Sequence, residues 1–234
     1  MQEFLAAWPS ETISIAPVSR VLTGAVSFFG GDFVLTRGNH KLGSHRIWGF
    51  SLPSGTLQTC PGMTPTCHSV CYAAALERYR PAAAARYRRN LVLSRQRWFG
   101  KRMRAYILAH GIRVVRIHIG GDFFSTKYAR KWLRIIRRCP RTLFYFYARA
   151  WRIPAIKSVL DRMAELPNCR AWYSIDRDTG LPTDLPPRVR LAWLMTSPED
   201  VPPSGSHLVF RIRRLRSRPT HLGAVSYTHL TLPT

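Results

Sequence analysis

Three cysteines within one short segment are the residues whose types and spacing point most directly to chemistry. Cys60, Cys67 and Cys71 all lie in the stretch TCPGMTPTCHSVCYAAA, residues 59–75. Three thiolates satisfy an iron–sulfur cluster of the 4Fe–4S type and leave one iron open. They equally suit a zinc ion whose fourth ligand comes from elsewhere, because zinc takes four N or S ligands. His68 directly follows Cys67, which makes joint chelation by these two residues awkward.

The neighbours of the cysteines predict the elements that position them. Pro and Gly residues break regular structure over 59–66, so this part is expected to be a loop. From about Cys67 the composition becomes helical. This would place the sulfurs of Cys67 and Cys71, four residues apart, on one face of a helix. The loop would then bring the side chain of Cys60 over these two sulfurs.

Strands and helices alternate along most of the chain. The predicted strands are IWGFSL (47–52), IRVVRIHI (112–119), TLFYFYAR (142–149), CRAWYSI (169–175), VRLAWLM (189–195) and HLVFRI (207–212). The predicted helices span 82–110, with Gly100 a weak point and Gly111 a stop, the residues after an N-cap at Ser125, and 153–166. The alternation predicts an α/β fold on a parallel sheet, either a partial (β/α) barrel or an open doubly wound sheet.

Small or polar residues follow several of these strands, in the segments GGDFFS, ARAW, SIDRD and TSPED. In both architectures function lies at the carboxyl ends of the strands, so these segments are expected to share one rim. The candidate site residues on this rim are Gly120, Gly121, Asp122, Arg149, Ser174 and Asp176. By their position, Arg149, Ser174 and Asp176 are candidates for contacts with a carboxylate or ribose group of a bound ligand. Surface ion pairing is the alternative role for them.

Composition restricts the class of protein. At 234 residues, 46% of them hydrophobic, the chain is long enough for one domain with a core. No apolar run approaches the roughly 20 residues of a membrane helix. The start of the chain lacks the basic region of a signal peptide, so we expect a soluble, cytoplasmic protein. Five cysteines in a reducing compartment argue against disulfides, and Cys139 and Cys169 fit core packing.

The net charge is strongly positive. The chain carries 36 Lys and Arg against 12 Asp and Glu, a formal charge of +24. Such an excess favours polyanionic partners, nucleic acid first among them. A GC-rich genome is the alternative source of part of it, since Arg, Ala and Pro have GC-rich codons, although codon bias does not explain the scarcity of acidic residues.

The chain divides into three parts. Residues 1–36 form a weakly patterned leader or strand pair, and 37–224 form a single α/β domain with its cysteine loop. The last ten residues, 225–234, read VSYTHLTLPT and match the in-frame translation of a transposon-end sequencing adapter. We therefore exclude them from the predicted fold and expect the natural protein to continue past Ala224.

Several motifs together resemble the gene product 88 family, which is named from mycobacterial phages. They are GNHKLGSHRIWGFSLPSG, TCPGMTPTCHSVCYA, RIHIGGDFFS and FYFYARAW, within about residues 37–210. The resemblance implies a phage or prophage source and a bacterial host cell. It carries no established biochemistry.

A more distant resemblance is to the radical SAM enzymes, in which a CxxxC cluster loop precedes a strand that ends in a Gly-Gly-acid turn. It implies a partial (β/α) barrel of that type, with Cys67 and Cys71 as the first two cluster ligands. The turn Gly120–Asp122 would bind S-adenosylmethionine (SAM), its carboxylate receiving the methionyl ammonium group. Ala74 stands where the third cysteine is expected, and Cys60 would replace that ligand from upstream.

Three functions follow from these patterns. The first is an iron–sulfur enzyme with radical-SAM-like architecture that acts on nucleic acid or a nucleotide. The second is a zinc-stabilised nucleic-acid-binding protein without catalysis. Aromatic residues interleaved with Arg over 86–106 would suit phosphate contact and base stacking, or else an amphipathic helix whose aromatics face the core. The third is a structural phage protein that carries a metal.

Overall fold

The computed structural model of the protein describes residues 35–37, 47–55, 57–197, 199–212 and 226–229. Of the predicted leader at 1–36, only Leu35 and Thr36 fall within these residues. The strands are β1 (Thr36–Arg37), β2 (Ile47–Phe50), β3 (Val114–Ile117), β4 (Leu143–Ala148), β5 (Cys169–Ile175), β6 (Val189–Met195), β7 (Leu208–Arg211) and β8 (Ser226–His229). The helices are α2 (Pro65–Ser69), α3 (Tyr72–Tyr79), α4 (Pro81–Arg95), α5 (Phe99–Ala109), α6 (Thr126–Arg137), the short 3-10 helix η3 (Ala150–Arg152) and α7 (Pro154–Ala164).

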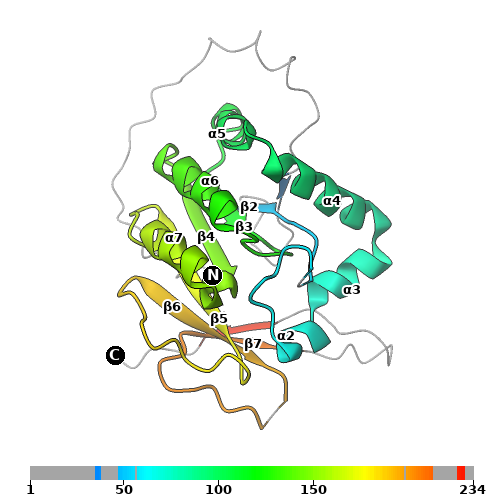
Figure 1. Ribbon diagram of the computed structural model, residues 1–234, viewed down its shortest axis with the longest axis vertical. Helices are drawn as coiled ribbons and strands as arrows, with labels where there is room; N and C mark the ends of the chain where they lie inside the picture. The colour runs from blue at the N-terminus through cyan, green and yellow to red at the C-terminus, as the bar shows by residue number, and fades with distance from the viewer. Residues whose placement is uncertain (1–34, 38–46, 56, 198, 213–225, 230–234) are drawn as a thin grey trace.

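The strands form one sheet whose spatial order follows the chain order from β1 to β8 (Figure 1). Strands β2 to β7 are parallel, and the edge strands β1 and β8 pair antiparallel with their neighbours. The predicted α/β class with a mostly parallel sheet is confirmed. The order never reverses, so the sheet lacks the switch point of a doubly wound fold. Among the described residues no pairing joins β1 to β8, so the sheet is open and no barrel closes.

Strand β8 lies within 225–234, the segment that we excluded as an adapter translation. It pairs with β7 from Leu208↔His229 to Arg211↔Ser226. Backbone pairing is open to any sequence, so this ladder says nothing about where the segment comes from.

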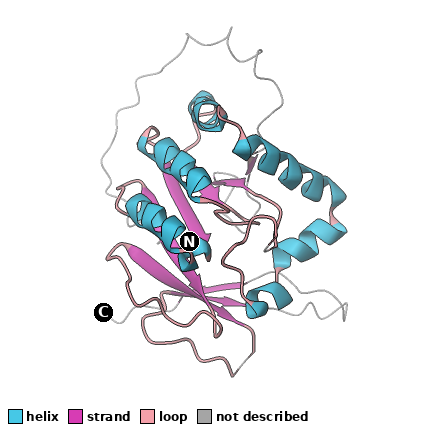
Figure 2. Ribbon diagram, viewed as in Figure 1, coloured by secondary structure: helices cyan, strands magenta, loops and turns pink. Residues whose placement is uncertain are grey.

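Helices α5, α6 and α7 pack side by side against the sheet (Figure 2). Right-handed crossovers between sequential parallel strands place their helices on the same face, which explains this single layer. The main core lies between the layers, where Trp132 of α6 meets Phe50 at 5.6 Å and Phe99 at 5.8 Å between ring centroids. A second buried cluster, which includes Tyr145 and Trp172, comes from strand residues that alternate with those of the main core.

The predicted helix from Cys67 is broken in the structure. Helix α2 ends at Ser69, and α3 begins at Tyr72. Between them Cys71 has an extended backbone, and its sulfur accepts a hydrogen bond from the Ala74 N–H at 3.5 Å. Because Cys71 is the N-cap of α3, it does not lie one turn after Cys67 on a common helix face.

The predicted helix at 82–110 is also two helices. The break falls at 96–98, whereas Gly100 lies inside α5. Gly111 is confirmed as the stop, since its φ of +56° is the left-handed conformation that ends helices. Ser125 is confirmed as the N-cap of α6, where its hydroxyl accepts from the Tyr128 N–H at 3.2 Å. Within the described residues no helix is both long enough and apolar enough to cross a membrane.

Lys131 fixes α4 to α6. Its buried Nζ donates to the carbonyl oxygens of Ser94 and Gln96, both at 2.7 Å. Carbonyls at a helix carboxyl end lack partners within the helix and lie at the negative end of its dipole, so an ammonium group is the matching donor.

Replacing Lys131 by Met keeps the apolar stem and removes both hydrogen bonds. We expect the free energy of unfolding in urea to fall by about 1.5–3 kcal/mol, as for buried bonds to a charged donor. Lys127→Met is the matched control, because Lys127 is exposed on the same helix and should change stability by no more than about 0.5 kcal/mol. Equal losses in the two variants would contradict this role of Lys131.

Candidate functional site

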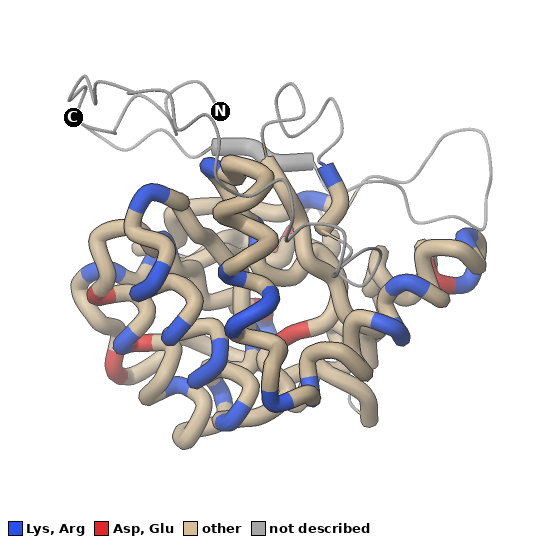
Figure 3. The backbone as a smooth tube through the Cα atoms, turned by 90° about the horizontal axis from the view of Figure 1, so that it is seen from above, with Lys and Arg blue, Asp and Glu red and all other residues tan. Residues whose placement is uncertain are grey.

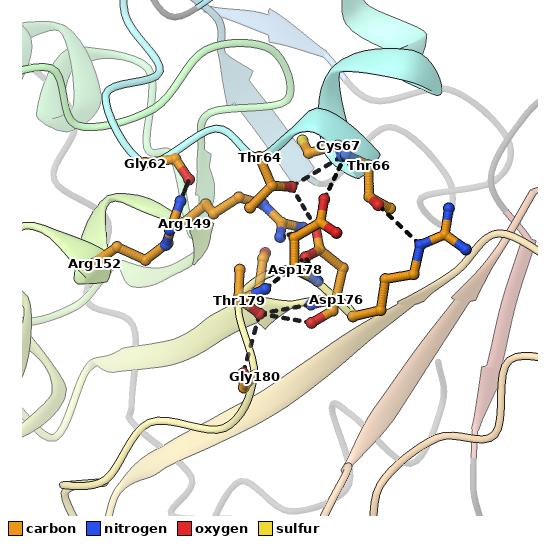
Figure 4. Close-up of polar contacts among 12 residues, drawn as sticks. Gly62, Thr64, Thr66, Cys67, Arg149, Arg152, Asp176, Asp178, Thr179 and Gly180 are labelled. Atoms are coloured by element: carbon orange, nitrogen blue, oxygen red, sulfur yellow. Dashed lines mark hydrogen bonds and ion pairs between the residues drawn. The ribbon is translucent and has the colours of Figure 1, made fainter.

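The cysteine loop crosses the carboxyl ends of the strands after β2. At Gly62 it touches the backbone of the segment that follows β4: an added Cβ would stand 2.1 Å from the Arg149 carbonyl oxygen. Arg152 holds the same point from the other side, since its Nη1 donates to the Gly62 carbonyl at 3.2 Å (Figure 4). Glycine is therefore required at position 62 for the loop to lie on the turn after β4.

The turn Gly120–Asp122, which follows β3, packs against the same loop. An added Cβ at Gly121 would stand 2.6 Å from the Thr59 hydroxyl, and the φ of Gly121 is +77°. An added Cβ at Gly120 would stand 3.1 Å from the Ala73 Cβ in α3. Close packing of the cysteine segment on the turn thus explains both glycines.

The three thiols lie beside this turn. Cys71 interacts electrostatically with both Cys60 and Cys67, and so does the carboxylate of Asp122. Burial raises the pKa of Cys60 to about 12, and Asp122 and Cys71 add to the increase. Burial also raises the pKa of Cys67, against the opposing effect of the Arg149 guanidinium. At Cys60 and Cys67 a thiolate is therefore costly without a compensating positive charge. Cys71 is only partly buried.

The thiols as placed do not form a compact ion site. Within the described part of the chain, no three His, Cys, Asp or Glu side chains lie close enough together to hold a metal ion. Zinc would require sulfurs about 2.3 Å from one ion. His68, the neighbour of Cys67, is exposed on α2.

Asp122 connects the ends of β3 and β4. Its Oδ1 accepts from the Phe123 N–H at 2.7 Å, and its Oδ2 accepts from the N–H groups of Arg149 (2.7 Å) and Ala150 (2.8 Å). Burial raises the pKa of Asp122 to about 6, against the lowering effect of these three N–H groups. With its three N–H partners, the side chain has an evident role in holding the two turns together.

Asp176 performs the same kind of role after β5. It is fully buried, and its Oδ2 forms an ion pair with Arg149 and accepts from the Thr64 hydroxyl at 2.6 Å. Thr64 is the N-cap of α2, and its Oγ1 accepts from the Cys67 N–H at 3.0 Å (Figure 4). Arg149 and Asp176 are therefore linked to the backbone of Cys67 through one hydroxyl.

Two further residues of the β5 loop hold the first turn of α2. The Asp178 carboxylate accepts from the Thr66 N–H at 2.7 Å, and Arg177 Nε donates to the Thr66 hydroxyl at 3.1 Å. Sequence analysis did not select Thr64, Asp178 or Gly62. The Thr-Pro pair at the start of α2 was a readable N-cap signal. No sequence signal indicated the contacts that Gly62 and Asp178 make with distant segments.

Ser174 stands apart from this network. Its carbonyl oxygen accepts from the Trp151 indole N–H at 2.9 Å. Among the described contacts its hydroxyl reaches no residue of the cysteine loop. Its predicted part in ligand binding stays a prediction.

Alanine at Gly62 should displace the cysteine loop, because the clash is with backbone that cannot rotate away. We expect Gly62→Ala to lower the free energy of unfolding by about 1–3 kcal/mol. Gly100→Ala is the control: its added Cβ would lie 3.9 Å from Ile135 inside α5, so stability should rise by up to about 1 kcal/mol. Urea unfolding of both variants measures this, and a neutral Gly62→Ala would refute the close approach.

Comparisons with known proteins agree with one of the two resemblances. The profile of the family described as Gene product 88 matches residues 33–227. Over 138 residues the chain is 31% identical to the Gene 88 protein of Mycobacterium phage L5 and 30% identical to that of Mycobacterium phage D29; the alignments cover 54% of this chain and 56% of each relative. The chain thus spans little more than half the length of these relatives, whose names state no activity. No solved structure matches the chain.

The resemblance to radical SAM enzymes is not part of these matches and stays a prediction. The family profile, by contrast, spans all three clustered thiols, the Gly120–Asp122 turn and the whole parallel part of the sheet. This chain belongs to the Gene product 88 family.

Proposed function

We propose that Cys60, Cys67 and Cys71 bind an iron–sulfur cluster, and that the protein is an enzyme that uses this cluster with SAM in a phage or prophage setting. The observation that carries the proposal is that thiols from three separate elements lie together beside Asp122. One comes from the loop after β2, one from α2 and one from the N-cap of α3.

A cluster suits this arrangement better than zinc does. A zinc ion binds all its sulfurs directly at about 2.3 Å, and the described residues do not offer such a group. In a cluster each thiolate binds a different iron, so the sulfurs stand farther apart. Cys71 raises the pKa of both other thiols electrostatically, which is compatible with that wider spacing.

The architecture is compatible with the radical SAM resemblance. Parallel strands in unbroken chain order, with their connecting helices in one layer, are the arrangement of a (β/α) barrel wall. The thiols lie at the carboxyl edge of the sheet, where such folds place their active sites. The open sheet supports the parallel strand order that the resemblance implies, but not its barrel curvature.

A bound cluster with three protein ligands would supply an open iron for SAM and the electron that cleaves its sulfonium bond. The protein's own part is to bind and orient. Asp122 uses three of its roughly four acceptor positions on backbone N–H groups, which leaves one on Oδ1 for an ammonium group. Arg149 and Asp176 neutralise each other, so we assign them to positioning Cys67 rather than to ligand contact.

Metal analysis after anaerobic reconstitution tests the cluster. We expect wild-type protein to be brown and to contain iron and sulfide in equal amounts, and Cys60→Ala, Cys67→Ala and Cys71→Ala each to lose most of both. Cys139→Ala and Cys169→Ala are matched controls, because both thiols belong to the main core, and they should load like wild type. Zinc in place of iron, or full loading of all three site variants, would defeat the proposal.

The role of SAM has a separate test. Addition of SAM to the reduced, loaded protein should shift the electron paramagnetic resonance spectrum of the cluster, because the ligand would bind the open iron directly. S-adenosylhomocysteine, which lacks the sulfonium charge, controls for nonspecific binding. An unchanged spectrum at millimolar SAM would remove the enzymatic half of the proposal and leave a cluster-binding protein.

A further inference from the structure

The middle of the chain is rich in cations and poor in acidic residues. Between Glu77 and Asp161 the sequence has 22 Lys and Arg, and Asp122 is the only acidic residue. Asp122 is buried and bound to backbone N–H groups. Figure 3 shows the resulting spread of Lys and Arg over the helices. This segment therefore holds 22 of the 36 Lys and Arg of the chain.

Helix α6 arranges part of this charge in a row. Its exposed residues are all cations, and Arg138 and Arg104 extend the row, since Arg104 Nε donates to the Arg138 carbonyl oxygen at 3.4 Å. We call the following set the α6 ridge: Lys127, Arg130, Arg134, Arg137, Arg138 and Arg104. At 100° per residue the five α6-side cations fall within an arc of about 100° and span about 16 Å.

The ridge is not explained by the fold. Among the described residues, ion pairs join Arg149 to Asp176 and Lys157 to Asp161 and Asp184, and none includes a ridge residue. Like charges also act on one another here: burial lowers the pKa of Lys131, and Lys127 and Arg134 lower it further. Uncompensated repulsion of this kind is relieved by an external anion.

We propose that the α6 ridge binds the phosphate backbone of a nucleic acid without regard to sequence. One strand of a duplex presents a phosphate about every 3.4 Å, so about five phosphates match the length of the ridge. The exposed part of α6 holds no Asn, Gln or aromatic side chain that reads or stacks on bases. Arg, which dominates the ridge, pairs with phosphate through two parallel hydrogen bonds. This inference does not depend on the cluster.

Fluorescence anisotropy with a labelled 30-base-pair duplex of random sequence tests the proposal over about 50–200 mM salt, the range in which phosphate contacts are strongly screened. The test variant carries Arg130→Gln, Arg134→Gln and Arg137→Gln, since Gln keeps helix propensity. The charge-matched control carries Arg188→Gln, Arg190→Gln and Arg211→Gln, three exposed arginines at or before β6 and β7. Circular dichroism and thermal midpoints confirm that both remain folded.

We expect the ridge variant to bind at least tenfold more weakly. The negative slope of log affinity against log salt should become less steep by about 2–3, because each lost arginine removes about one phosphate contact. The control should lose less than threefold. Equal losses in ridge and control variants would overturn the proposal, because only overall charge would then matter. Tighter binding to vesicles of equal phosphatidylcholine and phosphatidylserine than to the duplex, at the same salt, would also overturn it in favour of a membrane surface.

Discussion

Two buried carboxylates at the carboxyl edge of the sheet hold the rest of the site in place. A carboxylate without hydrogen-bond partners is very costly to bury, so Asp122 and Asp176 oblige their surroundings to supply donors. Asp122 takes three backbone N–H groups from the turns after β3 and β4. Asp176 takes Arg149, the Thr64 hydroxyl and two N–H groups of its own loop. The loops after β3, β4 and β5 and the start of α2 are thereby fixed relative to one another.

The positions of the thiols follow from this constraint. Cys67 depends on Asp176 through Thr64, because Thr64 both donates to the carboxylate and caps the helix that carries Cys67. The path of the loop around Cys60 depends on Gly62, which only fits against Arg149 because Asp122 holds the Arg149 backbone. Neither carboxylate touches a cysteine directly, yet both decide where the sulfurs lie. Both carboxylates have this structural role whatever the thiols bind.

Most of the fold could be predicted because its signals are local. Strands β3 to β7 fall within predicted segments, since β-branched and aromatic runs between turn residues leave little alternative. The predicted closing of the wall into a partial barrel, and the doubly wound alternative, are not what the sheet shows, because strand order depends on long-range packing. The helix expected from Cys67 failed for a different reason: a cysteine side chain acts as the N-cap of α3, a role that the usual Ser, Thr, Asp and Asn preferences do not anticipate.

The site could be predicted only in part, for the same reason. The Gly120–Asp122 turn and the clustered cysteines stand out as motifs, and the structure places them together. Thr64 and Asp178 are ordinary loop residues in the sequence, and their contacts join segments more than a hundred residues apart. Arg149 and Asp176 were selected as ligand contacts, with surface ion pairing as the alternative, and in the structure they form a buried ion pair with each other.

The geometry of α6 connects the buried edge with the outer charge. Because α6 follows the parallel strand β3, its first turn lies at the carboxyl edge of the sheet, just after the Gly120–Asp122 turn. The α6 ridge therefore begins at Lys127, at the end of α6 nearer that edge, and runs away from it toward Arg138. The amino end of the helix also adds the positive end of its dipole at that point, which favours a phosphate there. A nucleic acid bound along the ridge would thus have one end directed at the edge where the three thiols lie, without any contact that requires the thiols themselves.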